Sequence, residues 1–349
     1  MASPLVRLSK LRGRSGGIET IEAAERTGTR TKISLSPAWV TAILVGLAVL
    51  AMGLFMFYGL KGPLDYVLPR RALRMAAMVV VAAAVGVSTL LFQTVTANRI
   101  LTPSIMGFDA LYLMIQTLLV FFVGAAAWTT TPVGLRFAVE VALMVGFSFF
   151  LYRWLFTGGL NSLHLVLIVG IIIGTLFRAV SSLLQRLMDP NEYLILQDLF
   201  FASFNQVDTT LLVLSAVVVV ACAILAWRWR AKMDVMALGR EMAINLGVDH
   251  KRSVMSVLLL CAVLVSVSTA LVGPITFFGL LVVSLAYQLC RGFSHAWLLP
   301  ITVLLGIITL VAGQLVLEHV FGFATALSVA IEFAGGLLFL FLLLRGNLR

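Results

Sequence analysis

Charged residues are scarce in this sequence: Asp, Glu, Lys and Arg make up only 11% of its 349 residues. Apolar residues make up 61%, against the roughly 45–50% typical of soluble domains. So little charge cannot cover a water-facing surface of ordinary size, which excludes a soluble enzyme domain. Repeated uncharged runs of about 20 residues, the length that crosses a hydrocarbon core, predict an all-α polytopic membrane protein instead.

Residue groups that carry chemistry are also missing. The three cysteines, Cys222, Cys261 and Cys290, stand singly in apolar runs, and with four histidines they form no metal-ligand spacing. The P-loop pattern G-x-x-x-x-G-K is absent, so we expect no ATPase site in this chain. No paired carboxylates and no Ser, His and Asp set indicates catalysis. We therefore predict no enzyme activity, no metal and no catalytic residue.

The positive charge, a net +10 at pH 7, gathers beside the apolar runs. Such clusters are the usual signal of cytoplasmic loops, so they explain the charge without a nucleic-acid partner. Residues 1–36, rich in Arg, Ser, Gly and Thr, are predicted to form a disordered cytoplasmic tail. Residues 37–349 are predicted to form the transmembrane domain, with both termini in the cytoplasm.

About ten candidate spans follow the tail. They are residues 38–57, 75–97, 110–135, 133–152, 160–177, 209–227, two spans within 253–290 that Gly273 and Pro274 separate, 296–317 and 323–344. Arg136 and Glu140 lie four residues apart on one face of the fourth span, so we expect this pair to neutralise itself. Residues 178–208 are amphipathic, with a turn signal at 189–191, and are predicted to hold an external surface helix.

A short polar segment, residues 234–248, separates the sixth and seventh spans. Four of its apolar residues fall on one stripe at helical spacing: Val235, Leu238, Met242 and Leu246. Asp234 is placed to cap the start of a helix, and Gly247 suits the left-handed position that ends one. Because the segment is too short to cross a bilayer and is flanked by basic residues, we predict a short cytoplasmic helix.

A group of basic residues, Arg70, Arg71 and Arg74, precedes the second span on its predicted outer side. One interpretation is that these side chains anchor the helix end at the membrane surface. The other is that they form a docking surface for an acidic partner, because arginine pairs bidentately with carboxylates. The sequence leaves both interpretations open.

Four motifs, in order, resemble the permeases of the iron-siderophore and cobalamin (FecCD-type) class of ABC importers, over nearly all of the chain after the tail. They are LPRRALR at 68–74, FQTVTANRILTPSIMG at 92–107, ALGREMAINLG at 237–247 and GPITFFGLLV at 273–282. The stretch at 98–117 is most similar to the catecholate-siderophore subgroup; it reads NRILTPSIMGFDALYLMIQT. The chain departs from the family where Ser284 and Leu285 replace a common Pro-His, and where Arg240 replaces a common acidic residue.

The resemblance implies a ten-span permease subunit of an ABC importer in the bacterial inner membrane, which translocates an iron-siderophore complex. The implied partners are a second, different permease, two cytosolic ATPase subunits that hold ATP and Mg²⁺, and an external substrate-binding protein. This chain would itself bind no cofactor. The particular siderophore, and whether the two permeases are identical, stay open.

The resemblance also implies roles for individual residues. The coupling residues, which would seat in an ATPase groove, are Leu238, Gly239, Glu241, Ala243, Leu246 and Gly247. The residues that would receive the binding protein are Arg70, Arg71 and Arg74. The residues of the translocation path or its gate are Asn98, Pro103, Gly107, Gly273, Pro274 and Gly279.

An ion-coupled secondary transporter of a small molecule is the alternative. It requires ionisable groups in the middle of the membrane. Glu140 has Arg136 within one turn, His164 lies near a helix end, and only Glu332 falls well inside a predicted span. Glu332 is either a partnered interhelical group or a transport residue, and the sequence does not decide between them.

Overall fold

The computed structural model describes residues 36–60, 62–157, 163–205, 207–290, 294–320 and 327–344. These residues form helices and no strand, which confirms the predicted all-α class. The helices lie in one compact unit, Pro37–Arg349, and the predicted tail lies outside the described residues except for Ser36. The helices are α2 (Pro37–Phe57), α3 (Leu64–Thr96), the 3-10 helix η1 (Ser104–Met106), α4 (Phe108–Val123), α5 (Ala125–Thr130), α6 (Val133–Thr157), α7 (Leu163–Leu187), α8 (Pro190–Leu199), α9 (Thr209–Arg228), α10 (Arg230–Met236), α11 (Arg240–Asn245), α12 (His250–Val272), α13 (Phe278–Leu289), α14 (His295–His319) and α15 (Leu327–Leu344).

Seven of the described helices are long and apolar enough to cross a membrane: α2, α3, α6, α7, α9, α12 and α14. Three shorter apolar helices, α4, α13 and the Ser328–Leu337 part of α15, fall where the third, eighth and tenth spans were predicted. The chain is therefore a multi-pass membrane protein. Its apolar helices follow the predicted order, although α4 and α13, with 16 and 12 residues, are shorter than a crossing of roughly 20 residues.

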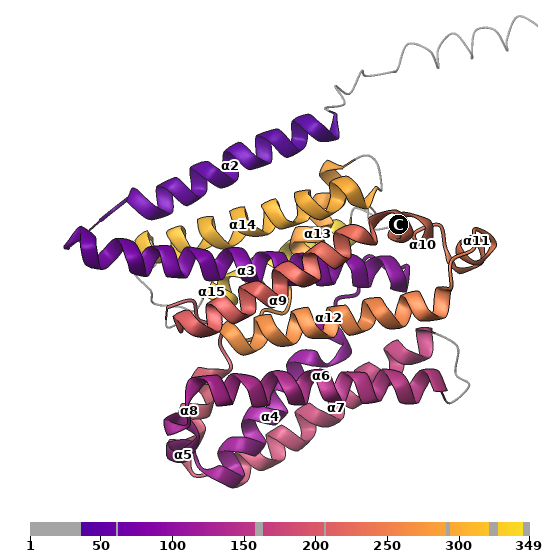
Figure 1. Cartoon of the computed structure of the whole chain (residues 1–349). Helices are drawn as coiled ribbons and strands as arrows, with labels where there is room; N and C mark the ends of the chain where they lie inside the picture. Colours follow the sequence, from indigo (N-terminus) through magenta and orange to yellow (C-terminus); the bar gives the residue numbers. More distant parts are fainter. Residues whose placement is uncertain are drawn as a thin grey trace, which may run out of the picture. The chain divides into compact units, whose positions relative to one another are not determined.

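The core of the bundle is built around α3 and α12. Of their apolar stretches, 67% and 72% of the residues are buried in the protein, against 22% in α2 and in α6. The central helix α3 packs on α14, α12, α9 and α13, whereas α4 packs on α7. Figure 1 shows α10 and α11 at one end of this bundle and α5 and α8 at the other. We call these the α11 end and the α8 end.

Several helix boundaries differ from the prediction because charged residues are accommodated inside helices. The helix α3 begins at Leu64, eleven residues before the predicted span, and includes Pro69 near its start. The helix α7 continues to Leu187 and includes Arg178 and Arg186. The predicted external segment therefore contains the end of α7 and the ten-residue helix α8, which Asp189 caps by accepting a hydrogen bond from the backbone N–H of Asn191 (2.8 Å).

The predicted third span, residues 110–135, does not form one continuous helix. Its helix α4 ends just before Gly124 (φ 89°), and the separate helix α5 follows. At its beginning, Gly107 (φ 98°) turns the chain into α4 against the middle of α7, where Gly170 and Gly174 lie. Non-helical backbone at this depth is tolerated because it is packed in protein rather than exposed to lipid.

Replacing Gly107 by Ala is expected to lower the thermal unfolding midpoint of the detergent-purified protein. A Cβ atom at Gly107 would lie 2.8 Å from the Cα of Gly174, and the positive φ alone costs an L-residue about 1–3 kcal/mol. Gly134→Ala in α6, where nothing lies within 4 Å of an added Cβ, is the matched control and should unfold at or above the wild-type midpoint. Equal midpoints for both variants would show that the close packing at Gly107 is not required.

Candidate functional site

The segment between the sixth and seventh predicted spans forms two short helices rather than one. Asp234 lies inside α10, which ends at Met236, and α11 starts at Arg240. Gly239, at φ 97° and ψ 166°, breaks the helix between them, so the prediction of a single helix was wrong. Gly247 adopts a left-handed conformation (φ 82°) just after α11, as predicted. We call residues 237–247 the coupling segment.

The coupling segment exposes large apolar side chains. Leu238, Met242 and Leu246 are 62%, 59% and 62% exposed, and Ile244 is 49% exposed. Ala243, by contrast, is fully buried and anchors α11, which packs mainly on α10 and α12. Glu241 is exposed on the same short helix. An apolar cluster on a segment outside the long spans indicates a surface that a partner covers.

Asp234 does not cap its own helix, as the sequence suggested, but the start of α14. Its Oδ1 accepts hydrogen bonds from the backbone N–H of His295 (2.6 Å) and from the Nδ1 atom of the same residue (2.7 Å), while Ser294 Oγ donates to Oδ2 (3.3 Å). The Nε2 atom of His295 lies 2.8 Å from Thr94 Oγ1, near the end of α3. Sequence reasoning missed this contact because no local pattern connects residues so far apart.

A cavity of about 810 Å³ adjoins these residues at the α11 end. Asn98, predicted to belong to the gate, lines it together with Asp234 and His295. The Asn98 side chain accepts a hydrogen bond from the backbone N–H of Ile100 (3.0 Å). Gln93 also lines the cavity, and both atoms of its buried amide have no hydrogen-bond partner.

The other predicted path residues are buried. Pro103 and Gly273 line one small cavity of about 10 Å³, room for roughly one water molecule. Gly107 packs on α7, Gly279 packs on Thr89 of α3, and Pro274 is buried in the segment that leads into α13. A bulky chelate does not fit among these residues in this conformation.

Two buried or half-buried carboxylates lie near this small cavity. Asp109, in the first turn of α4, lines the cavity, and its Oδ2 atom has no hydrogen-bond partner among the residues that the structure describes. Glu332 of α15 accepts hydrogen bonds from the Thr276 hydroxyl (3.2 Å) and, more weakly, from the Thr276 backbone N–H (3.5 Å). Of the two readings of Glu332, the structure favours the partnered interhelical group. Asp109 was missed because it falls at the edge of a predicted span.

The three arginines before the second predicted span have different surroundings. Arg71 is only 5% exposed, and it donates to the carbonyls of Phe55 and Tyr58 (2.8 Å each) and to Glu318 (2.8 Å). Arg71 joins the end of α2 to the end of α14. Its guanidinium is therefore not available to an outside partner, so the docking role predicted for Arg71 does not fit. Arg70 is exposed and lies over the Tyr66 ring (4.1 Å), and Arg74 is half-buried.

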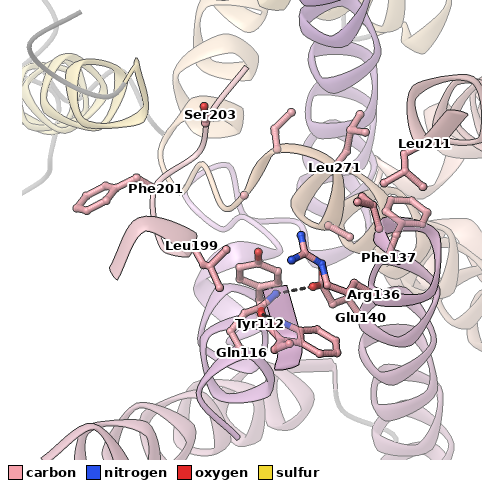
Figure 2. A pocket seen from close by; sticks show the side chains of 15 residues that line it. Tyr112, Gln116, Arg136, Phe137, Glu140, Leu199, Phe201, Ser203, Leu211 and Leu271 are labelled. Atoms are coloured by element: carbon pink, nitrogen blue, oxygen red, sulfur yellow. Dashed lines mark hydrogen bonds between the residues drawn. The ribbon is translucent and has the colours of Figure 1, made fainter. Parts of the chain in front are cut away.

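A second cavity, about 160 Å³, lies at the α8 end (Figure 2). Glu140 on its floor accepts a hydrogen bond from Gln116 (2.7 Å), which in turn accepts one from the Trp128 indole N–H (3.2 Å). Among the described residues Arg136 forms no salt bridge with Glu140 and its buried Nε has no hydrogen-bond partner, so the predicted pair lacks a direct contact, although the Arg136 charge still acts on Glu140 at longer range. Pockets for drug-sized ligands are about 300–1,000 Å³, so this cavity is too small for a chelate.

The fold and this site define a multi-pass membrane protein with an exposed apolar segment outside its long spans. The model of the FecCD transport family matches residues 63–345, and the chain belongs to this family. It is 48% identical over 306 residues to the petrobactin import system permease protein YclO of Bacillus subtilis (strain 168), covering 88% of this chain and 97% of that one. It is 36% identical to the petrobactin import system permease protein FatC of Bacillus anthracis, covering 93% of each.

A solved structure described as a metal-chelate type ABC transporter in an inward-facing conformation has the same fold. Its TM-score is 0.76 at 23% identity, and the match covers 88% of this chain and 99% of that one. At this identity the similarity concerns the fold alone. The family assignment confirms the resemblance on which the residue roles were predicted, whereas the roles themselves stay predictions.

Replacing Arg71 by Ala is expected to lower the unfolding midpoint much more than replacing Arg70. Breaking a buried ion pair leaves an unpaired charge and costs roughly 3–5 kcal/mol, and Glu318 is the charge left behind here. Arg70→Ala removes only an exposed contact with an aromatic ring, worth about 0.5–1 kcal/mol. The double variant Arg71→Ala/Glu318→Ala should recover part of the loss. Equal midpoints for the two single variants would contradict the clamp role of Arg71.

Proposed function

We propose that this chain is the permease subunit of an ABC importer that carries an iron-siderophore complex across the bacterial inner membrane. The observation that carries the proposal is the 48% identity to a petrobactin import permease, along 97% of that protein. The match covers 88% of this chain, so it includes most of the membrane domain. Petrobactin, or a related catecholate siderophore, is the cargo to test first.

In this proposal the coupling segment docks into a cytosolic ATPase subunit. Burying side chains such as Leu238, Met242 and Leu246 stabilises a complex by roughly 1.5–3 kcal/mol each, and their exposure makes that free energy available to a partner. Glu241 supplies a polar contact at the edge. Gly239 and Gly247, both at positive φ, set the angle at which α11 projects. ATP and Mg²⁺ belong to the ATPase subunits.

The proposal also fixes the orientation and the other partners. The α11 end, with the basic residues around the coupling segment, faces the cytoplasm together with both termini. The α8 end faces outward, where Arg70 and Arg74 receive acidic residues of a substrate-binding protein. A second permease of related sequence completes the path, because a bulky chelate does not fit among Pro103, Gly107 and Gly273.

The ion-coupled alternative has less support. Two of the carboxylates that it would use are engaged in hydrogen bonds, Glu140 with Gln116 and Glu332 with Thr276, whereas Asp109 has one oxygen without a partner among the described residues. Family membership points to ATP-driven import, and the exposed apolar coupling segment has no role in a self-contained carrier.

The source of energy separates the two functions. Pulldown of the tagged chain from native membranes should recover an ATPase, a second permease and a binding protein. Uptake of iron-55-labelled ferric petrobactin by proteoliposomes of that complex should require Mg-ATP on the ATPase side and persist when a protonophore collapses the proton gradient. Immediate loss of uptake with the protonophore while ATP remains would support the secondary carrier and exclude the importer.

Reversing the charge of Arg70 and Arg74 to Glu should weaken binding of the recovered binding protein, most strongly at low salt, because like charges then face each other. Surface plasmon resonance at two salt concentrations measures this. Arg186→Glu, an exposed arginine in the last turn of α7, is the control for one charge reversal at the α8 end and is compared with Arg70→Glu alone. Affinity that falls equally in the control would assign the effect to overall charge and not to docking.

A further inference from the structure

If a partner that displaces the coupling segment is also to move the spans, the coupling segment and the spans must be in contact. Its helix α11 packs mainly on α10 and α12, and α10 in turn packs on α14, α3 and α9. The face of α10 that carries Met233 and Met236 is buried, with these side chains 0% and 4% exposed. Both α10 and α12 therefore touch the coupling segment and the central helix α3, and α10 also packs on α14.

Asp234 provides the polar part of this connection. Two hydrogen bonds, of 2.6 and 2.7 Å, run from His295 to one oxygen of Asp234, and both belong to the first residue of α14. Hydrogen bonds to an ionised carboxylate are shorter and about twice as strong as those between neutral groups. A displacement of α10 must therefore carry the start of α14 with it or break both bonds.

His295 extends the connection to α3. Its side chain is buried (1% exposed) and its two ring nitrogens face different helices. Because a carboxylate oxygen only accepts, Nδ1 is the donor toward Asp234, and the ring is held with Nε2 at 2.8 Å from the Thr94 hydroxyl. Thr94 lies in the last turn of α3, and its one hydroxyl proton is shared between Nε2 of His295 and the Leu90 carbonyl of its own helix (2.9 Å).

We propose that Asp234, His295 and Thr94 form a rigid link that transmits displacement of the coupling segment to the ends of α14 and α3. This inference rests on the proposed function and adds the route by which the work of the ATPase reaches the spans. The 810 Å³ cavity beside the link, lined by all three residues, leaves room for these helix ends to move together. The three are positioning residues, because the role proposed for them acts through their contacts with one another.

The test measures cargo transported per ATP hydrolysed by the complex in proteoliposomes, with ferric petrobactin and the recovered binding protein as probes. Thr94→Val removes the hydroxyl that meets His295 and should lower this ratio roughly twofold to thirtyfold, with the basal ATPase rate unchanged. The matched control is Thr96→Val, because the Thr96 hydroxyl bonds only carbonyls of its own helix, at Phe92 (2.8 Å) and Gln93 (3.3 Å). That control should keep the wild-type ratio.

Substitutions of Asp234 test the other half of the link. Asp234→Ala removes the acceptor and should lower the ratio like Thr94→Val, whereas Asp234→Asn keeps an acceptor oxygen and should retain most of it. Size-exclusion chromatography checks that each complex assembles. If the wild-type complex is coupled but Thr94→Val gives the same ratio of cargo to ATP as Thr96→Val, the link is overturned and the proposed function stands. The same conclusion follows if Asp234→Asn lowers this ratio as much as Asp234→Ala. A wild-type complex with no ATP-dependent uptake would overturn the proposed function itself.

Discussion

Apolar side chains that face water are the constraint on which this account depends. Along α2 and α9 an exposed Leu or Val meets lipid and carries no cost, since lipid tails are as apolar as the side chains. Leu238, Met242 and Leu246 are in a different position, because they lie among Arg240, Glu241 and other charged residues outside the long spans. Their exposure is expected if a partner protein covers them, which indicates that the chain is one subunit of a larger complex.

The interior of the bundle contains irregular backbone beside its helices. Two of its apolar helices, α4 and α13, are shorter than a full crossing, and glycines at positive φ, Gly107 and Gly273, lead into them. Irregular backbone of this kind survives at depth only when protein surrounds it. Asp109, one oxygen of which has no hydrogen-bond partner among the described residues, lines the small cavity at this point.

Much of the fold was predictable because a helix that crosses lipid must be long enough to span it and must carry few charges. The bounds of α2, α9 and α14 agree with the predicted spans to within two residues at either end. The errors occur where a charged residue lies inside a helix: Arg71, which carbonyls and Glu318 bind, in α3, and Arg178 in α7. A sequence window counts such a charge as a boundary, because it does not see the distant partner.

The candidate site was predictable in position but not in its connections. Motif similarity located the coupling segment, and the exposure of Leu238 and Leu246 is consistent with that assignment. The partners of Asp234 are 60 and 61 residues away in the sequence, and only the packed helices bring them together. The same holds for Arg71, which the sequence suggests is a surface charge but which the folded structure buries between the ends of α2 and α14.

The most direct measurement of the central claim is labelling of a single cysteine at position 242, in a chain whose three native cysteines are replaced. A membrane-impermeant maleimide should label Met242→Cys from the cytoplasmic face only, and added ATPase subunits should protect it. Labelling from the outside, or unchanged labelling in the assembled complex, would contradict the claim that this segment receives the ATPase.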